Sequence, residues 1–432
     1  MLLRHPLNDR MASEDFQPIQ GMSDLAYPEI SLWQRLEQTA RHTLSLYGFS
    51  EVRTPIVEKR AVFERSLGDT TDVVQKEMYQ FEDAGGRPLV LRPEGTAGIT
   101  RYIAGLGQDG AGSRVFYVGP MFRRERPQAG RKRQFHQFGA EAVGEANPHT
   151  DAEMIAMQVH LLRAWGLKDF RIRLNTRGLA EDRVAVQAAM LERLTAVKDQ
   201  LCDDCRRRME GNVLRVLDCK NPSCRAVVAQ LPPMTDFMSE SARAYLHEVM
   251  RVIQRLELEV EIDPNLVRGL DYYQHTVWEI SHHGLGAQDA IGAGGRYLIT
   301  MGNRPVHGVG FAMGMERIIM ALTAEQGPYV PPSVPLVWIV SLDASLLDVH
   351  LQLAQTLRLR GVACGIDLNG RSVKAQMRAA GRAAATWTIL HGQTEQDKGT
   401  FQLKNMESGV QQEVTMPELL EQLNPAVLHT LP

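Results

Sequence analysis

A proline-rich segment near residue 330 places the strongest constraint on how this chain can fold. The sequence EQGPYVPPSVP, residues 325–335, has prolines at four of its eleven positions. Segments of this kind form semi-stiff spacers between domains. A chain of 432 residues is long enough for two or three domains. We therefore expect one domain over residues 1–324, a linker over 325–335 and a second domain over 336–432.

The sequence before the linker combines strand-like runs with helical regions. Residues 31–47 have apolar side chains at helical spacing and are followed by Gly48, which suits the position after a helix. Runs bounded by Gly and Pro are typical of antiparallel strands; they are EVRTPIVE, PLVLRPEG, SRVFYVGPMFRRE, RQFHQFGAEAVG and TVWEISHH. Residues 179–258 return to helical periodicity. The pattern predicts an α+β domain: an antiparallel sheet with helices and a helical insertion at about 179–258.

After the linker, strands and helices alternate. VPLVWIVSL and VACGIDL are strand-like, whereas VHLQLAQTLRLRG and SVKAQMRAAGRA are helical. Alternation of strands with helices of this length is typical of a small α/β domain with a largely parallel sheet.

Composition excludes a strongly basic chain and a membrane span. Hydrophobic residues make up 44% and charged residues 23%, with a net charge of −3, so any RNA contact must rest on local patches. Two basic runs are candidates, although charge alone favours a solvated face for either of them; they are Arg123, Arg124, Arg126, Arg131, Lys132 and Arg133, and Arg206, Arg207 and Arg208. There is no uncharged apolar run of about 18 residues, and the first residues lack the apolar core of a secretory signal. We expect a cytoplasmic protein.

Four of the five cysteines fall in one short segment. Cys202 and Cys205 are spaced CxxC, Cys219 and Cys224 are spaced C-x4-C, and Cys364 stands apart. Without a secretory signal, disulfides are not expected. The spacing resembles a structural zinc site, although the second half departs from CxxC. Zinc binding and reduced surface thiols both remain open.

The most specific stretch is GPMFRRERPQAGRKRQFHQFGAEAVG, residues 119–144. Arg123 ends a strand-like run, where its guanidinium could meet a phosphate. Strand alternation then places Gln137 and Glu141 on one face. Polar side chains facing inward would cost several kcal/mol if they were left unpaired. The alternative is a core strand with incidental polar residues.

This stretch resembles motif two of the class II aminoacyl-tRNA synthetases, and the chain is similar to the histidyl-tRNA synthetase family along nearly its whole length. The resemblance implies that Arg123 grips the α-phosphate of ATP. YGFSEVRTPIVE resembles motif one, which implies a homodimer whose interface includes Pro55. GVGFAMGMERIIM resembles motif three, which implies that Arg317 stacks on adenine and reaches the γ-phosphate.

Three further segments are similar to those that select histidine. LRPEGTAG resembles the element in which Glu94, with Gly95 and Thr96, holds the α-amino group. LVRGLDYYQHTVWE and AIGAGGRY resemble the two histidine-specific signatures. These imply that Arg268 lies beside the reacting carboxylate, that Tyr272 and Tyr273 line the imidazole pocket with Gln137 nearby, and that Glu141 and Tyr273 approach the two ring nitrogens. An imidazole offers one donor and one acceptor, which a carboxylate and a phenol can satisfy.

Two segments depart from the family pattern. Gln274 and His275 stand where the family commonly has an arginine after the double tyrosine, and Leu298 stands where it has an aspartate. These changes bear on positioning near the second signature.

The segment from about residue 334 resembles an anticodon-binding domain. Its strand-to-helix stretch carries Arg371, Lys374, Arg378 and Arg382, which suit an RNA backbone. A solvated amphipathic helix is the alternative.

Together the resemblances imply ligation of L-histidine to tRNA(His) through a histidyl-adenylate, with ATP as substrate, Mg²⁺ as its companion and no protein-bound metal in the active site. Arg123 and Arg268 would stabilise the reacting phosphate, and no base is assigned for the transfer step. Two alternatives exist. A non-catalytic histidine-sensing paralogue that regulates an ATP phosphoribosyltransferase lacks the C-terminal domain, and synthetases for proline, threonine or glycine lack the RGLDYY and GAGGRY segments.

Overall fold

The computed structural model describes residues 16–424 apart from 69–70, 72, 111, 145, 212, 218, 268–271 and 333–334, and apart from the side chains of residues 108, 109, 287 and 288. The chain forms two compact units that divide between Val330 and Pro331. We call them the N-terminal body and the C-terminal body.

An eight-stranded sheet organises the N-terminal body, in the order β1-β5-β6-β11-β10-β9-β7-β8. The end pairs β1/β5 and β7/β8 are parallel and the other neighbours are antiparallel. The strands are β1 (Ser50–Glu51), β5 (Arg114–Phe122), β6 (Gln134–Val143), β7 (Phe170–Thr176), β8 (Glu261–Ile262), β9 (Tyr273–His282), β10 (Ala290–Met301) and β11 (Arg304–Gly314). The antiparallel sheet predicted from the sequence is present.

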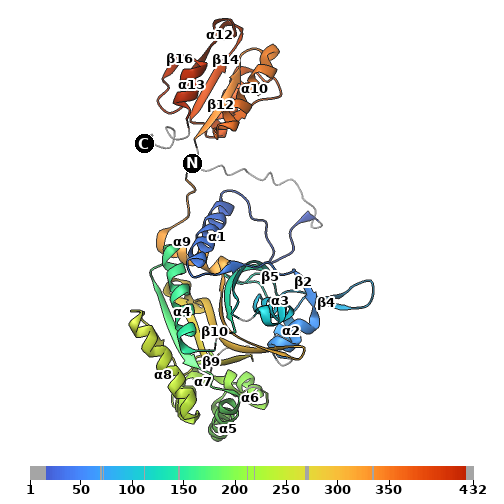
Figure 1. The fold of residues 1–432 in the computed structure, drawn as a ribbon, viewed down its shortest axis with the longest axis vertical. Helices are drawn as coiled ribbons and strands as arrows, with labels where there is room; N and C mark the ends of the chain where they lie inside the picture. The colour runs from blue at the N-terminus through green and yellow to red at the C-terminus, as the bar shows by residue number, and fades with distance from the viewer. Residues whose placement is uncertain are drawn as a thin grey trace. The chain divides into compact units, whose positions relative to one another are not determined.

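Helices cover both faces of this sheet (Figure 1). One face packs on the main core with α1 (Glu29–Ser45), α4 (Pro148–Ala164), α8 (Glu240–Arg255) and α9 (Met315–Gln326). The opposite face packs on α2 (Arg60–Leu67), α3 (Thr96–Leu106) and a small antiparallel sheet of β2 (Val57–Lys59), β4 (Pro88–Leu91) and β3 (Gln80–Glu82). Because successive strand residues alternate between faces, Phe138 and Ala140 enter the main core while Glu141 faces α3.

The segment EVRTPIVE forms two strands rather than one. β1 pairs with β5 in the large sheet, whereas β2 pairs with β4 in the small one, and Pro55 lies between them. A proline has no backbone N–H to donate to a strand pair, which accounts for the break. Helix α1 ends at Ser45, slightly earlier than expected, and Gly48 has the positive φ of +76° that was anticipated.

The helical insertion has a core of its own. It contains α5 (Ala180–Ala196), α6 (Asp203–Glu210), α7 (Pro222–Val228) and the first turn of α8. Its buried side chains run from Val186 to Ala242, whereas Leu246, Val249 and Ile253 of α8 pack into the main core. The separately packed module is therefore shorter than the expected 179–258.

The predicted linker begins too early, because α9 continues to Gln326 and Gly327 follows it with φ +79°. Glu325 is helical, and its carboxylate accepts hydrogen bonds from the backbone N–H groups of Lys168 and Asp169 at 3.1 and 2.9 Å. Its Oε1 also lies 2.9 Å from Nε2 of His282. Glu325 thus belongs to the N-terminal body.

The C-terminal body contains a five-stranded sheet in the order β13-β12-β14-β15-β16. Its strands are β12 (Leu336–Ser341), β13 (Ala363–Ile366), β14 (Trp387–His391), β15 (Thr400–Asn405) and β16 (Gln411–Thr415), and its helices are α10 (Leu347–Leu359), α11 (Val373–Arg382), α12 (Gln393–Lys398) and α13 (Met416–Gln422). β12 is parallel to β13 and β14, but β15 and β16 are antiparallel to their neighbours. The expected largely parallel sheet is thus mixed, because a hairpin extends it.

None of the helices described is long and apolar enough to cross a membrane.

Candidate active site

Glu94 lies in the loop between β4 and α3 and caps the helix. Its Oε2 accepts a hydrogen bond from the N–H of Thr96 at 2.7 Å, and its Oε1 accepts one from the N–H of Ala97 at 2.8 Å. The side chain is buried, and burial raises the pKa of this carboxyl although the two N–H groups and Arg123 oppose the rise. Each oxygen retains a lone pair that could accept a hydrogen bond from an ammonium group.

Glu141 faces the same space from β6, and Thr96 joins the two carboxylates. The Thr96 hydroxyl donates to Oε1 of Glu141 at 2.7 Å. Oε2 of Glu141 is buried and makes no hydrogen bond within 3.5 Å among the described residues. Burial, assisted by the nearby charge of Glu94, raises the pKa of Glu141 to about 8, although the hydroxyls of Thr96 and Tyr297 oppose the rise. Such a group needs a donor or a cation from outside the protein to be stable as a carboxylate.

A glycine on the neighbouring strand makes room for this carboxylate. Gly310 of β11 pairs with Glu141, and a Cβ added at Gly310 would lie 1.7 Å from Oε2. No side chain other than hydrogen could occupy that position without displacing Glu141.

Four tyrosines surround the carboxylates. Tyr272 lies 4.7 Å from Tyr273 and 5.8 Å from Tyr297 between ring centroids, so the structure brings together the two predicted tyrosines and one that was missed. Tyr117 of β5 is the second residue that was missed. The hydroxyls of Tyr117 and Tyr297 are buried and make no hydrogen bond within 3.5 Å in the described part of the chain. Burial and the charge of Glu141 raise the pKa of both hydroxyls.

Glycines in the sequence indicate where the rings of Tyr117 and Tyr297 pack. A Cβ at Gly95 would lie 2.1 Å from the ring of Tyr117, and one at Gly139 would lie 2.4 Å from the same ring. Gly308 makes room for Tyr297 in the same way, at 2.5 Å. Glycines opposite aromatic residues in neighbouring strands therefore marked the walls of the cavity.

Gln137 lies on β6 two alternations before Glu141, on the same face, as predicted. It is half-buried, and its Oε1 is buried without a hydrogen-bond partner among the residues described. Its backbone pairs with Gly119 and Gly314 in the neighbouring strands. The unused amide oxygen could accept a hydrogen bond from a ligand.

Arg123 is fixed beside the Glu94 loop. Its Nε donates to the carbonyl of Pro93 at 2.9 Å, its guanidinium carbon lies 5.3 Å from the ring centre of Phe135, and Glu125 lies 3.7 Å from its terminal nitrogen. These contacts hold a cation at the end of β5, which is the place expected from the sequence.

Arg317 lies in the first turn of α9. Its Nε donates to the carbonyl of Gly130 at 3.0 Å and a terminal nitrogen donates to that of Ala290 at 2.6 Å. Burial lowers the pKa of this arginine, and the charge of Arg131 adds to that effect. Arg317 therefore ties the basic loop after β5 to the start of β10. Arg268 lies outside the described residues, so its role stays a prediction.

Arg296, in the second histidine signature, has a structural role. It forms a buried ion pair with Asp151 of α4, and Asp151 also accepts hydrogen bonds from Thr276 and Tyr245, the latter at 3.1 Å. His275, one of the departures from the family pattern, stacks on Tyr245 with ring centroids 4.1 Å apart. This departure is accommodated beside a structural cluster rather than between the site carboxylates.

Leu298, the other departing position noted after GGRY, contacts the site through its backbone. Its N–H donates to the carbonyl of Tyr272 at 3.0 Å. An interaction of this kind does not depend on the side chain.

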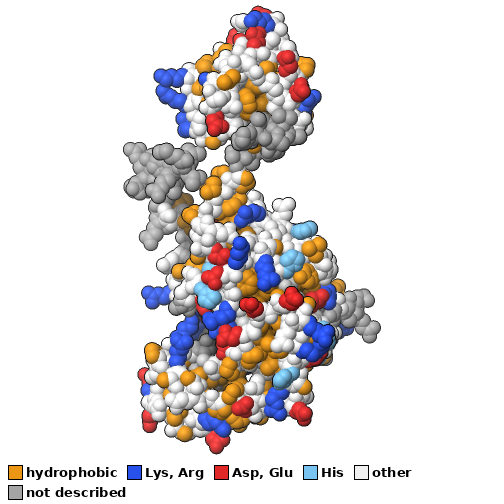
Figure 2. Space-filling view, turned by 90° about the vertical axis from the view of Figure 1, so that its left-hand side faces the viewer, with side chains coloured by type: hydrophobic (Ala, Val, Ile, Leu, Met, Phe, Trp, Pro, Cys, Tyr) orange, Lys and Arg blue, Asp and Glu red, His pale blue; other side chains and the backbone are white. Residues whose placement is uncertain are grey.

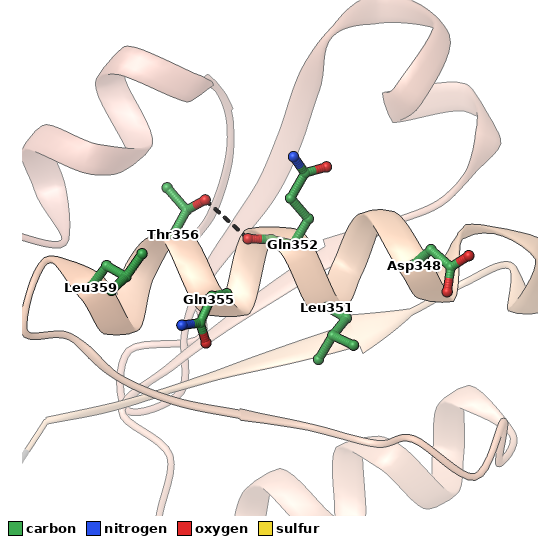
Figure 3. Close-up of a pocket in the computed structure, with 6 residues that line it drawn as sticks. All are labelled: Asp348, Leu351, Gln352, Gln355, Thr356 and Leu359. Carbon is green, nitrogen blue, oxygen red and sulfur yellow. Dashed lines mark hydrogen bonds between the residues drawn. The ribbon is translucent and has the colours of Figure 1, made fainter.

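Two further features lie away from this cavity. A hollow on α10 is lined by Asp348, Leu351, Gln352, Gln355, Thr356 and Leu359 (Figure 3). Its side chains project from one face of a single helix, and the hydrogen bond drawn there, from the Thr356 hydroxyl to the Gln352 carbonyl at 2.9 Å, is internal to that helix. Asp348 is its one titratable group, so the hollow lacks a catalytic constellation. Elsewhere, the one metal-ligand group found in the described part of the chain consists of the insertion cysteines.

Comparisons with known proteins match both parts of the chain to known families. Residues 21–318 match the family described as histidyl-tRNA synthetase, and residues 336–424 match an anticodon binding domain. A relative from Halothermothrix orenii, named histidine--tRNA ligase, is 41% identical over 422 residues, covering 96% of this chain and 100% of that protein. A relative of the same name from Synechococcus elongatus is 44% identical over 410 residues, covering 94% of each.

Solved structures give the same answer for the fold. Apo histidyl-tRNA synthetase from S. aureus has a TM-score of 0.77 at 30% identity, with 94% of this chain and 99% of that chain covered. A Bacillus halodurans C structure, titled ATP phosphoribosyltransferase regulatory subunit/histidyl-tRNA synthetase, has a TM-score of 0.65 at 20% identity, covers 87% of this chain and 98% of that one, and supports the fold alone. From the family match and the full-length relatives, the chain belongs to the histidyl-tRNA synthetase family.

Proposed function

We propose that this chain ligates L-histidine to tRNA(His) through a histidyl-adenylate, and that histidine binds in the cavity between Glu94 and Glu141. One observation carries the proposal. Two buried carboxylates are joined by Thr96, and one oxygen of Glu141 makes no hydrogen bond in the described part of the chain. An amino acid with a cationic amine and a hydrogen-bonding ring would satisfy both groups.

Recognition of histidine follows from the donors and acceptors on either side of the cavity. Glu94, with the backbone at Gly95 and the hydroxyl of Thr96, would receive the α-ammonium group, while Gln137 offers a free amide oxygen nearby. Glu141 would accept the imidazole N–H, and the Tyr273 hydroxyl would approach the second ring nitrogen. A substrate without these atoms leaves buried polar groups unpaired. The site should therefore favour histidine over such a substrate by roughly 10⁴-fold.

Activation requires charge stabilisation at the α-phosphate of ATP rather than a covalent nucleophile. Attack by the histidine carboxylate forms the carboxyl–phosphate bond and expels pyrophosphate. Arg123 would bind the α-phosphate from the side of the Glu94 loop, and Arg268 is proposed for the opposite side from its sequence motif. Positioned cations of this kind lower the barrier because they are oriented before the reaction. Arg317 would contact adenine and the γ-phosphate.

Magnesium would neutralise charge on the ATP phosphates. It is usually held by one or two carboxylates together with phosphate oxygens. Three carboxylates act electrostatically on Arg317 and are the candidates to hold the magnesium: Glu125, Glu279 and Asp289.

The catalytic function is favoured over a histidine-sensing regulatory role. The relatives that cover nearly all of this chain are named histidine--tRNA ligase, and the chain has the C-terminal body with its anticodon-domain match. The predicted catalytic cation Arg123 is retained as well.

A homodimer is supported by an apolar face on the small sheet. In β4, Leu91 pairs with Val57 of β2 and Leu89 pairs with Phe81 of β3. Because paired residues and alternate residues of a strand share a face, all four side chains lie on one face of the small sheet. Val57 and Phe81 are each 42% exposed, while Val90 on the opposite face is buried. Motif one contributes β2, so this face is a candidate for the dimer interface. Sedimentation should give about twice 48.3 kDa.

Binding of tRNA is supported by α11 in the C-terminal body. Lys374, Arg378 and Arg382 are exposed and recur every four residues, so they share one side of the helix. Arg371 is partly engaged by an ion pair with Asp367. Figure 2 shows Lys and Arg side chains gathered at one edge of this body. Neutralising the three exposed residues should weaken tRNA charging, and the slope of tRNA affinity against salt concentration should fall by up to about three released counterions. Pyrophosphate exchange should not change.

The direct test is histidine-dependent exchange of pyrophosphate into ATP. The wild-type protein should exchange only when histidine is present, and Arg123→Ala should lose most of that activity. Arg87→Ala removes an exposed arginine paired with Asp83 and serves as the matched control. Exchange driven by another amino acid would contradict the proposal.

Arg268→Ala should lower adenylate formation far more than ATP affinity, because its proposed contact is made chiefly in the transition state. Single-turnover kinetics and equilibrium ATP binding separate the two effects. Equal losses in both would contradict the proposed role.

A further inference from the structure

The four cysteines of the insertion meet at one point in its core. Cys202 is the N-cap residue of α6 and Cys205 lies in its first turn, while Cys219 precedes α7 and Cys224 lies within it. Cys205 and Cys224 are fully buried, and Cys202 and Cys219 are half-buried. Two separate segments, each at the start of a helix, thus contribute two sulfurs each.

The sulfur positions match a tetrahedral metal site. All four Sγ atoms lie within 4.8 Å of one another, and those of Cys202 and Cys219 are 3.9 Å apart. Four sulfurs bound to zinc at about 2.3 Å are separated by about 3.8 Å. The N–H of Cys202 also donates to Sγ of Cys224 at 3.2 Å, an interaction that stabilises a thiolate.

Disulfides and unligated thiols fit the cluster less well than a metal does. All four cysteines are free, and 3.9 Å is about twice the length of a disulfide bond. Unligated surface thiols would have no reason to converge from a CxxC and a C-x4-C segment onto one buried point. Soft sulfur ligands in a closed tetrahedral arrangement are typical of structural zinc.

The module also has a physical need for such a ligand. Its separate core runs only from Val186 to Ala242, and the part that carries the cysteines consists of helices of eight, four and seven residues. Cores this small are usually stabilised by a disulfide or a metal.

Cations beside the cluster suit its charge. Four thiolates and one Zn²⁺ carry a net charge of −2, and Arg207, Arg208 and Lys220 line the hollow next to Cys202 and Cys219. Asp203 and Asp204 line the same hollow and pair with Arg206 and Arg207.

We propose that Cys202, Cys205, Cys219 and Cys224 bind one Zn²⁺ ion that holds the helical insertion together. Binding releases the thiol protons to solvent, so four S–H bonds are replaced by four Zn–S bonds with no change in oxidation state. The site is separate from the histidine cavity, and its role is structural because all four positions are filled by protein ligands.

The test is metal analysis of the full-length protein, purified without a polyhistidine tag and dialysed against metal-free buffer. Elemental analysis should find about one zinc per chain, and a mercurial reagent that blocks thiols should release the same amount to a colorimetric indicator. Cys205→Ser and Cys224→Ser should lose most of the zinc. Cys364→Ser, which alters a buried cysteine of the C-terminal body, is the matched control and should keep it.

The wild-type stoichiometry decides the proposal even where a serine variant fails to fold. Removal of zinc should also increase amide hydrogen exchange over residues 186–242 more than in α1 and α4. Zinc far below one per chain, iron in its place, two disulfides, or zinc retained in both folded serine variants would overturn the proposal.

Discussion

Two carboxylates packed against the large sheet are equally buried but differ in their electrostatic surroundings. Asp151 in α4 is 0% exposed and Glu141 in β6 is 1% exposed. Asp151 has an arginine, a threonine and a tyrosine as partners. Glu141 has a hydrogen bond from Thr96 on one oxygen and none on the other in the described part of the chain. Because burying an unpaired charge is unfavourable, the first cluster stabilises the fold, and we propose that a ligand completes the second.

The pKa directions agree with this contrast. Burial raises the pKa of Asp151, but Arg296 opposes the rise directly. Burial raises that of Glu141 to about 8, and the neighbouring charge of Glu94 adds to the effect rather than opposing it. A carboxyl that stays protonated near neutral pH loses its proton when a hydrogen-bond donor or a cation is placed beside it, because either lowers its pKa.

The largest effect should follow from breaking the completed cluster. Arg296→Ala leaves Asp151 buried without its cation, which should lower the free energy of unfolding by about 3–5 kcal/mol. Glu141→Gln should keep or raise the stability at pH 7, because it removes a carboxyl whose pKa is raised by burial. Urea unfolding of both variants, with Arg87→Ala as an exposed control, measures the difference. If both variants lost a similar free energy of unfolding, Asp151 and Glu141 would not differ in the way described.

The next effect concerns activity rather than stability. Glu141→Gln should lower kcat/KM for histidine in pyrophosphate exchange by about 10- to 100-fold, since it removes a charge-assisted hydrogen bond of about 1.5–3 kcal/mol. Thr96→Ser keeps the bridging hydroxyl and should retain most activity, whereas Thr96→Val should not. An unchanged kcat/KM in Glu141→Gln would place histidine elsewhere.

The third effect is a pH dependence of stability. The folded pKa of Glu141 is about 8, above its ordinary value of 4.5. Its contribution to stability is therefore fully present below about pH 4.5 and is lost as the pH rises towards 8. Because each unit of pKa shift corresponds to about 1.4 kcal/mol, the wild type should lose several kcal/mol relative to Glu141→Gln across this range. If stability varied with pH in the same way for the wild type and for Glu141→Gln, the pKa of Glu141 would not be raised.

Sequence reasoning found the residues whose placement depends on local geometry. Strand alternation placed Gln137 and Glu141 on one face, and Arg123 follows β5 as expected. It missed Tyr117 and Tyr297, because an aromatic residue in a strand is ordinarily a core residue. Only the fold shows that both rings lie against glycines of neighbouring strands.

Roles that depend on distant partners could not be predicted. The arginine of GGRY is structural because Asp151 lies 145 positions away in the chain and meets it only after folding. Likewise the position of Glu325 in α9 depends on backbone N–H groups 156 and 157 residues earlier. The cysteine spacing was compatible with zinc, but convergence of two distant pairs is a tertiary property.

Isothermal titration of histidine into the protein tests the central claim, that histidine completes the charge at Glu141. With a pKa of about 8, Glu141 is mostly protonated at pH 7, and we propose that this proton goes to solvent when the carboxylate accepts the imidazole N–H. Titrations in buffers of different ionisation enthalpy should therefore reveal release of most of one proton per histidine bound. Glu141→Gln should release none and Arg87→Ala should match the wild type. Tight histidine binding by the wild-type protein without proton release would contradict the account.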